Sequence, residues 1–413
     1  IIGGGINGAG IARDAGMRGI KTLLLEAGDF GRGTSSWSTR LIHGGLRYLE
    51  YGELPLVWES LHERRRLLDN APHLVKPLCL TIPIYKGARR GRWLIRLGML
   101  AYDLLSLGKK LPSHSMLSRE QLQGAEPGLA QDGLVGGASY YDAQVTFAER
   151  LVLENVLAAQ EQGVIARNYT PVIGLSAVAG DLHQVRFCSP SGEEGVAVAP
   201  VVVNAAGPWV DSVLGLAERP FPRLMGGTKG SHIVVGSFAG APGNAVYVEA
   251  LSDGRPVFIV PWNDQYLIGT TDIRTEADPD NVRASDAEIA YLLDECNRVF
   301  PDARLEVNDV HFVYAGIRPL PFQEEGPESA ITRRHIIHAH EGDADGIFSI
   351  IGGKLTTYRN LAEQTVDRVV SILGRKARPC ATRDAPLPGG DGSESANSAA
   401  AALAPGGSKR LLG

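Results

Sequence analysis

The chain begins with the hydrophobic pattern of a strand, a tight turn, a helix and a second strand. Residues 1–2 are an apolar stub, residues 3–8 are rich in glycine, and residues 9–18 have the apolar spacing of a helix. Residues 22–26 form a short apolar run that ends in a glutamate. This order predicts the first βαβ unit of a dinucleotide-binding fold. Because a buried strand is longer than two residues, we expect the chain to begin inside that strand.

Apolar segments of the same kinds recur later in the chain. Residues 149–162 and 356–373 have helical spacing, and the first of them precedes a short strand-like run at 164–166. Residues 201–207 and 348–351 are further apolar runs that lead into glycine. We interpret these segments as additional helices and strands of the same sheet, supplied by distant parts of the chain.

Between residues 225 and 319 the pattern changes to alternation of apolar and polar residues. Turn residues interrupt this alternation at 252–254 and 263–264, and residues 286–300 have helical spacing. Alternation with a period of two is typical of strands that bury one face, so this region predicts a mostly antiparallel sheet with a helix at its edge.

The patterns together predict an α/β fold with a second domain inserted into a Rossmann-like one. Residues 388–413 are rich in Gly, Ser and Ala, and we expect them to be disordered. The nucleotide-binding domain is assigned to residues 1–75, 140–224 and 330–380, and the substrate or cap domain to 76–139 and 225–329.

Composition narrows the function classes. A formal net charge of -5 does not favour binding to nucleic acid, which requires a basic surface. The four cysteines lie far apart in sequence, so neither a redox pair nor a zinc site is expected. The sequence has no signal peptide and no apolar run long enough to span a bilayer.

Gly3, Gly5 and Gly8 form the motif G-x-G-x-x-G between the first strand and the first helix. Glycines at these positions let the backbone approach a pyrophosphate, whose charge the helix N-terminus stabilises. Glu26, at the end of the next strand, is placed to accept hydrogen bonds from a ribose. The alternative is a structural βαβ turn that binds nothing.

A run of hydroxyl residues, Thr34, Ser35 and Ser36, precedes a second Gly-Gly pair at 44–45. This pattern resembles the second pyrophosphate-binding element of the large FAD oxidoreductase superfamily that includes the D-amino acid and glycine oxidases. The string from residue 35 to 50 is most similar to that of the FAD-dependent glycerol-3-phosphate dehydrogenases. FAD rather than NAD is the cofactor that this resemblance implies.

Other blocks resemble the same family, and the similarity covers residues 1 to about 375. The family's usual C-terminal helical domain is missing, which leaves the expected homodimer open. The similar blocks are Asn204-Ala205-Ala206-Gly207-Pro208-Trp209, Lys229-Gly230-Ser231-His232, Ile268-Gly269-Thr270-Thr271-Asp272, Gly316-Ile317-Arg318-Pro319-Leu320, Ile331-Thr332-Arg333 and Gly352-Gly353-Lys354-Leu355-Thr356-Thr357-Tyr358-Arg359.

The resemblance implies oxidation of sn-glycerol 3-phosphate to dihydroxyacetone phosphate. Hydride would pass to flavin N5, and the electrons would continue to a membrane quinone. The residues expected to contact FAD are Gly3, Gly5, Ile6, Asn7, Gly8, Glu26, Ala27, Thr34, Ser35, Ser36, His43, Gly44, Gly45, Leu46, Val172, Ala205, Ala206, Gly207, Gly353, Leu355 and Thr356.

A phosphate dianion in a partly closed pocket requires several cationic partners. Arg47, Arg318, Arg333 and Lys354 lie beside glycine turns or predicted strand ends, where side chains can converge, and Tyr48 adjoins the first of them. Arg318 is in addition a candidate catalytic residue. The alternative is that these cations are exposed surface residues.

Three residues are candidates for the chemistry itself. Lys354 precedes a helix whose N-terminus would stabilise negative charge on a reduced flavin. His232 and His43 are candidate bases for the substrate hydroxyl, because imidazole titrates near neutral pH. The alternatives are a structural histidine for His232 and a flavin-packing role for His43.

Residues 89–107 are first basic and then strongly apolar. Arg89, Arg90, Arg92 and Arg96 precede or interrupt an apolar helix with a narrow polar stripe. We interpret this stretch as a membrane-interface helix, which would attach the protein peripherally to the cytoplasmic face of the inner or plasma membrane. The alternative is a buried core helix.

Two other functions remain open. An amine or amino-acid oxidase of the same superfamily would release peroxide and would not need several phosphate-binding cations. A truncated, non-catalytic FAD-binding scaffold would hold a flavin that no small substrate reduces.

Overall fold

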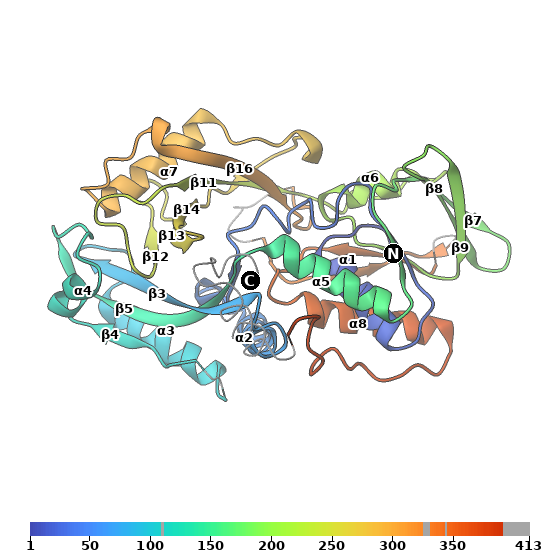
Figure 1. Ribbon diagram of the computed structural model, residues 1–413, viewed down its shortest axis with the longest axis horizontal. Coiled ribbons are helices and arrows are strands. Elements are labelled where there is room, and N and C mark those ends of the chain that lie inside the picture. Colours follow the sequence, from blue (N-terminus) through green and yellow to red (C-terminus); the bar gives the residue numbers. More distant parts are fainter. Residues whose placement is uncertain (109–110, 325–330, 343–344, 391–413) are drawn as a thin grey trace, which may run out of the picture.

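A computed structural model describes residues 1–108, 111–324, 331–342 and 345–390. Figure 1 shows an elongated molecule with two layered parts. One part surrounds the N-terminus and contains α1, α5 and α8, and the other contains the long strands β3, β5, β11 and β16. The predicted α/β class is confirmed.

The part around the N-terminus contains a parallel sheet core with helices packed on it. Ile2 bridges in parallel to Leu25 on one side and to Asn204 on the other, so the short first strand lies at the centre. Helices α1 and α5 pack together, and so do α1 and α8. The elements are α1 (Ile6–Met17), β1 (Leu23–Leu25), α5 (Ala148–Glu161), β6 (Ile165–Arg167), β10 (Val202–Asn204), β17 (Ile336–Ala339), β18 (Ile347–Ile351) and α8 (Tyr358–Leu373).

Helix α1 begins three residues earlier than the pattern indicated. The segment 3–8 was expected to be a turn, but the helix already starts at Ile6 and includes Gly8. The apolar spacing did not show this, because Asn7 and Gly8 follow Ile6 and are typical of a turn. Conversely, α8 starts at Tyr358, two residues later than expected.

The second part is built on a ten-stranded, mostly antiparallel sheet, as the alternation predicted. Its order is β15-β11-β14-β13-β12-β3-β5-β2, with β16 pairing β11 and β4 pairing β5. The expected helix is present as α7 (Asp286–Val299), but it packs on β11, β13 and β14 inside the sheet and not at its edge. The strands are β2 (Leu41–Ile42), β3 (Val75–Tyr85), β4 (Ser115–Leu117), β5 (Leu134–Val145), β11 (Thr228–Val235), β12 (Ala245–Glu249), β13 (Pro256–Trp262), β14 (Gln265–Gly269), β15 (Ile273–Arg274) and β16 (Val310–Arg318).

The sequence patterns missed two features of this architecture. The longest strands, β3 and β5, lie in or beside the region 76–139, where no strand was expected. They pair over their full length. A separate three-stranded antiparallel sheet was also missed, formed by β7 (Val172–Val178), β8 (Leu182–Cys188) and β9 (Glu194–Ala199).

The C-terminal segment is described only to residue 390, and residues 391–413 of the expected tail lie outside the described part. Leu387 is buried in the core beside α1, and its backbone amide donates to Asn70 O (2.8 Å). Gly390 donates its amide to Leu387 O (2.8 Å). The chain up to Gly390 therefore packs on the part of the molecule that contains α1.

The stretch 89–107 forms α3 (Arg92–Leu105), which lies on the surface. Only Met99 and Tyr102 of this helix are buried, whereas Trp93 is 78% exposed and Leu97 65%. The alternative of a core helix is therefore wrong. In the described part of the chain, no helix combines the length and apolarity needed to cross a membrane. The remaining helical elements are η1 (Leu46–Leu49), α2 (Leu54–Asn70), α4 (Arg119–Ala125), α6 (Val210–Leu214), η2 (Gly207–Trp209), η3 (Pro279–Asn281) and η4 (Val307–Asp309).

Candidate functional site

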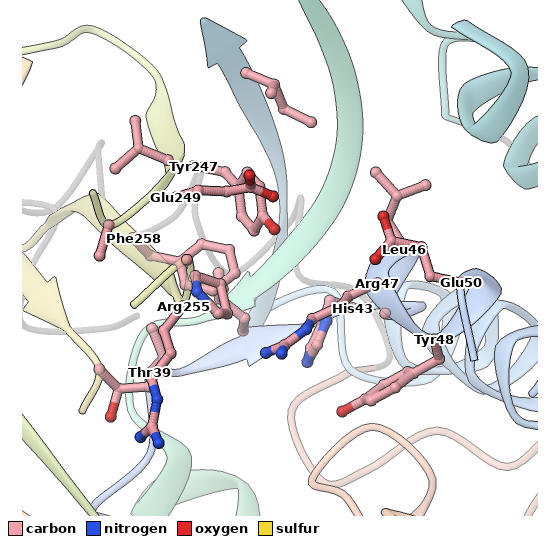
Figure 2. Close-up of a pocket in the computed structure, with 18 of the residues that line it drawn as sticks. Thr39, His43, Leu46, Arg47, Tyr48, Glu50, Tyr247, Glu249, Arg255 and Phe258 are labelled. Atoms are coloured by element: carbon pink, nitrogen blue, oxygen red, sulfur yellow. The ribbon is translucent and has the colours of Figure 1, made fainter. Parts of the chain in front are cut away.

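A cavity of about 1100 Å³ lies where the two parts of the molecule meet. Figure 2 shows residues 43–50 on one wall and Tyr247, Glu249, Arg255 and Phe258 on the opposite wall. Strand β2 and the turn after it supply the first wall, and β12 and β13 supply the second. The cavity is thus lined by segments that are far apart in sequence.

The glycines of the motif have different roles: one is required by the fold, and another leaves space for a ligand. A Cβ on Gly8 would lie 1.9 Å from Gly3 O, so the fold itself requires glycine there. A Cβ on Gly5 would meet only Ser35 Oγ, at 3.5 Å. No side chain caps α1, although Ile6 N donates to Ser35 Oγ (3.0 Å). The space beside Gly5 and the helix N-terminus together fit a pyrophosphate.

Glu26 lies at the end of β1, as expected. Its Oε2 accepts the amide of Gly4 (2.7 Å) and its Oε1 accepts that of Gly28 (2.8 Å). These bonds fix the carboxylate and leave lone pairs for ribose hydroxyls. Ala27 directly follows Glu26 in the chain.

The hydroxyls of Thr34, Ser35 and Ser36 have different hydrogen-bond partners. Thr34 Oγ1 donates to Ile317 O (2.6 Å), and Ser36 Oγ donates to Gly31 O (2.7 Å). Ser35 Oγ is the one that accepts from the first turn of α1. Thr34 and Ser36 therefore hold the loop in place, while Ser35 connects it to the glycine motif.

Two loops from opposite ends of the chain meet behind the cavity. His43 N donates to Thr356 Oγ1 (3.1 Å), and Lys354 Nζ donates to His43 O (3.2 Å). Gly353 has a φ of +94°, which favours glycine, and its Cα faces Asn7. The expected FAD residues that line the cavity are Thr34, His43, Gly45, Leu46, Gly353, Leu355 and Thr356.

The other expected FAD residues do not line this cavity. Gly44 is buried, and its amide is directed to Tyr102 OH (3.0 Å). Ala205 donates its amide to Ile2 O (2.8 Å), and Val172 packs against the cluster that contains Ile2. The set around the glycine motif is Gly3, Gly5, Ile6, Asn7, Gly8, Glu26, Ala27, Val172, Ala205, Ala206 and Gly207, together with Ser35 and Ser36.

All four candidate cations, and Tyr48, line the cavity. Arg318 uses both terminal nitrogens within the protein, with Asp272 Oδ1 at 3.0 Å and Thr270 Oγ1 at 2.9 Å. Arg333 Nη2 donates to Asp272 Oδ2 (3.2 Å). The guanidinium of Arg47 donates through Nη2 to Tyr51 OH (3.2 Å), and its Nε is buried without a hydrogen-bond partner in the described part of the chain.

Lys354 is enclosed more tightly than the sequence indicated. Its Nζ donates to Ser60 Oγ (3.0 Å) and lies 4.9 Å from the centroid of the Tyr48 ring. Burial lowers the pKa of the Lys354 ammonium to about 8. The charge of this residue therefore depends on pH in the physiological range.

Both candidate histidines are neutral at neutral pH. Burial, with Arg318 and Arg40 nearby, lowers the pKa of His232 to about 3. Its Nε2 lies 2.8 Å from Thr39 Oγ1, its ring stacks on Tyr314 at 4.8 Å, and its Nδ1 has no partner in the protein. Burial, followed by the charge of Lys354, lowers the pKa of His43 well below its ordinary value.

Sequence reasoning missed three residues that shape the site. Asp272 bridges Arg318 and Arg333, and Thr39 holds the His232 ring. The buried carboxylate of Asp142 accepts from Tyr102 OH (2.7 Å) and holds the loop at Gly44. The available signal was that Asp272 and Thr39 lie inside blocks that resemble the family, whereas Asp142 lies in no such block.

Other chemistries find no support in the described part of the chain. It contains no group of three or more His, Cys, Asp or Glu side chains arranged to hold a metal ion. All four cysteines lie in that part and are free thiols.

Comparison with known proteins identifies what the chain is similar to. Residues 1–359 match the family model described as "DAO: FAD dependent oxidoreductase". The chain is 53% identical over 403 residues to a glycerol-3-phosphate dehydrogenase of Synechocystis sp., covering 95% of this chain and 73% of that protein. It is 40% identical over 393 residues to a D-erythritol 1-phosphate dehydrogenase of Brucella abortus, covering 95% and 77%.

A solved structure agrees with these matches. The glycerol-3-phosphate dehydrogenase of Bacillus halodurans, complexed with FAD, superposes with a TM-score of 0.77 at 33% identity, covering 97% of this chain and 71% of that one. The expected cofactor, FAD, and the expected fold are confirmed.

The glycine motif yields a prediction that separates fold from cofactor. Gly5→Val should leave the protein folded but weaken FAD binding at least about tenfold, or about 1.4 kcal/mol, because the side chain would enter the pyrophosphate space. Quenching of FAD fluorescence on titration with apoprotein measures this, and circular dichroism reports the fold. Gly8→Ala is the matched comparison and should also lower the melting temperature. Wild-type affinity in Gly5→Val would contradict the assignment.

Proposed function

The chain belongs to the family of FAD-dependent glycerol-3-phosphate dehydrogenases, and from this premise we propose that it oxidises the C2 hydroxyl of sn-glycerol 3-phosphate to give dihydroxyacetone phosphate. The observation that carries the proposal is the convergence of Arg47, Arg318, Arg333 and Lys354 on one cavity. An amine oxidase would have no use for this number of cations around its substrate. A scaffold without activity would not need them either.

The cations are proposed to hold the phosphate. Arg47 lines the cavity and offers the terminal N–H groups that Tyr51 does not accept, Arg333 offers the guanidinium atoms not used by Asp272, and Lys354 retains one N–H beyond its two hydrogen bonds. Charge-assisted hydrogen bonds of this kind contribute about 1.5–3 kcal/mol each. Tyr48 is proposed to stabilise the Lys354 ammonium through a cation–π contact with its ring.

His232 is proposed as the base that takes the C2 hydroxyl proton. It lines the cavity and its neutral imidazole has one ring nitrogen with a lone pair, but burial keeps its pKa at about 3, so it is a weaker base than the near-neutral imidazole expected from the sequence. Arg318 is proposed to stabilise developing negative charge on the substrate oxygen. FAD, when bound, supplies the hydride acceptor, and residues of the loops 43–46 and 353–356 would hold its ring system.

The 40% identical relative suggests a second substrate of the same class. D-Erythritol 1-phosphate carries the same phosphate on a chain longer by one carbon. Because the relative named for glycerol 3-phosphate is more similar, at 53% identity, we propose glycerol 3-phosphate as the better substrate. Both compounds would rely on the same cations.

The electron acceptor is proposed to be a membrane quinone, reached through α3 at the cytoplasmic face. Leu94, Leu97 and Ala101 of this helix line the same cavity, so its apolar surface continues from the site to the outside. Arg89, Arg92 and Arg96 are exposed and available to anionic headgroups. Arg90 is not available in this way, because it forms an ion pair with Glu50. Three of the four expected arginines therefore remain.

The division of the chain into domains is part of the same proposal. Segments 1–75, 140–224 and 330–380 would hold FAD, and segments 76–139 and 225–329 would cover the substrate. The proposal is supported by the position of the cavity between the glycine motif side and the ten-stranded sheet.

The central test is anaerobic reduction of the bound flavin. Glycerol 3-phosphate should bleach the visible flavin absorption, and glycerol should do so at least about 100-fold less efficiently, or about 2.7 kcal/mol, because it lacks the phosphate contacts. Stopped-flow absorbance gives both second-order rate constants. A flavin that neither compound bleaches would refute the proposed activity, and equal rates would refute the phosphate assignment.

The pKa of Lys354 predicts a pH dependence. The ammonium is charged below about pH 8 and loses its proton as the pH rises through that value, so kcat/KM for glycerol 3-phosphate should fall above about pH 8. Lys354→Arg should lose this decline, even if its activity is lower, because a guanidinium stays charged. Steady-state kinetics from pH 6.5 to 9.5 with an artificial dye as acceptor tests this. An identical decline in the variant would assign it to another group.

The exposed face of α3 predicts binding to lipid. Wild-type protein should float with vesicles that contain anionic lipid, and a Trp93→Glu, Leu97→Glu variant should remain at the bottom of the gradient while still yellow. Leu153→Glu, an exposed apolar residue of α5 outside this face, is the matched control and should float. Equal behaviour of wild type and the double variant would reject α3 as the attachment surface.

A further inference from the structure

Asp272 places a carboxylate in the middle of the cationic cluster. The residue lies between β14 and β15 and lines the cavity. Its Oδ1 accepts from Arg318 Nη1 (3.0 Å) and its Oδ2 accepts from Arg333 Nη2 (3.2 Å). One carboxylate thus joins a guanidinium from β16 to one from the segment that follows residue 330.

A negative charge at this place opposes the binding of a phosphate. Burial by itself would raise the pKa of the Asp272 carboxyl, but Arg318 and Arg333 lower it below its ordinary value, so the group is ionised. An ionised carboxylate repels an anion brought to the same cavity. The Asp272 carboxylate must therefore contribute something to the site that offsets its repulsion of the phosphate.

The surroundings of the two arginines indicate that function. Arg318 is fixed on four sides, since Thr228, Thr270 and the Thr271 carbonyl also accept from it. Arg333 lies outside any helix or strand, and its ion pair with Asp272 is what ties its guanidinium to the cluster. Without that carboxylate, two like charges would face each other, and Arg333 would lose its fixed orientation.

We propose that Asp272 is a positioning residue that holds Arg318 and Arg333 side by side, so that the phosphate bound by Arg333 and the C2 oxygen beside Arg318 are kept in the one alignment that allows oxidation. This inference rests on the proposed function, because it takes a phosphorylated alcohol as the ligand. In this proposal Asp272 acts through the two arginines and not on the reacting atoms.

A positioning role and a purely electrostatic role for Asp272 predict opposite results when the carboxylate is removed. If Asp272 acted only as a charge, its removal would make the cavity more cationic, and glycerol 3-phosphate would bind more tightly and react at the same rate. If it positions the arginines, the substrate loses its alignment and turnover falls. Inorganic phosphate has no C2 to align, so its binding should be insensitive to orientation.

The test compares Asp272→Asn with wild-type holoenzyme. We expect kcat/KM for glycerol 3-phosphate to fall about 30-fold or more, mostly in kcat, while the inhibition constant of inorganic phosphate worsens by less than about threefold or improves. Glu276→Gln, which removes an exposed ion pair with Arg223 outside the cavity, is the matched control and should behave as wild type. Flavin content and the melting temperature are measured for each protein.

The outcomes distinguish this inference from the proposed function. If wild type itself is not reduced by glycerol 3-phosphate, the proposed function fails. If wild type is reduced and Asp272→Asn matches it, or substrate and phosphate are weakened equally, the positioning role is overturned. If Asp272→Asn fails to retain FAD, Asp272→Glu is measured instead, because it keeps the charge and displaces it by one methylene. Loss of kcat in that variant supports positioning, and wild-type kinetics overturns it.

Discussion

Arg64 of α2 and Asp142 of β5 form an ion pair that is almost completely buried, with side-chain exposures of 1% and 2%. The carboxylate also accepts from Tyr102 OH and from the amide of Gly44, and Arg64 donates to the carbonyl of Tyr141 (2.9 Å). Removing one member of such a pair leaves an uncompensated buried charge, at a cost of about 3–5 kcal/mol. The position of the cavity wall formed by residues 43–50 depends on this pair, because it fixes the loop at Gly44.

The same interaction connects the surface helix to the interior. Tyr102 is one of the two buried residues of α3, and its hydroxyl lies between Asp142 and Gly44. The exposed apolar face of α3 is therefore anchored to the loop behind the cavity. Because Met99 and Tyr102 hold the helix on its inner side, its outer apolar side is left exposed.

The cavity concentrates positive charge at an energetic cost that the protein offsets locally. Lys354 is stabilised by the carbonyl of His43 and the hydroxyl of Ser60, yet burial still lowers its pKa to about 8. Asp272 offsets two of the arginines. A site of this kind favours a dianion, which restores the balance of charge when it binds.

The sequence by itself determined the fold class, the cofactor and the family, because these depend on local patterns. The glycine motif, the acid at the end of β1 and the alternation between residues 225 and 319 each require only neighbouring residues to be recognised. The same patterns and the family resemblance named four of the cations that line the cavity. The start of α1 at Ile6 and the long strands β3 and β5 were missed, since glycine and mixed polar positions hide their periodicity.

Only the tertiary structure decided which role each of the predicted site residues has. Gly8 is required by contact with Gly3 O and Gly5 is not, and this difference depends on how the loop folds back on itself. Arg90 leaves the set of free cations because Glu50 is brought to it by a separate segment. Asp272 and Asp142 were not predicted, because these carboxylates acquire their roles from partners that lie between 40 and 98 residues away in the chain. Pairing between distant charges is set by packing, and sequence spacing carries no record of it.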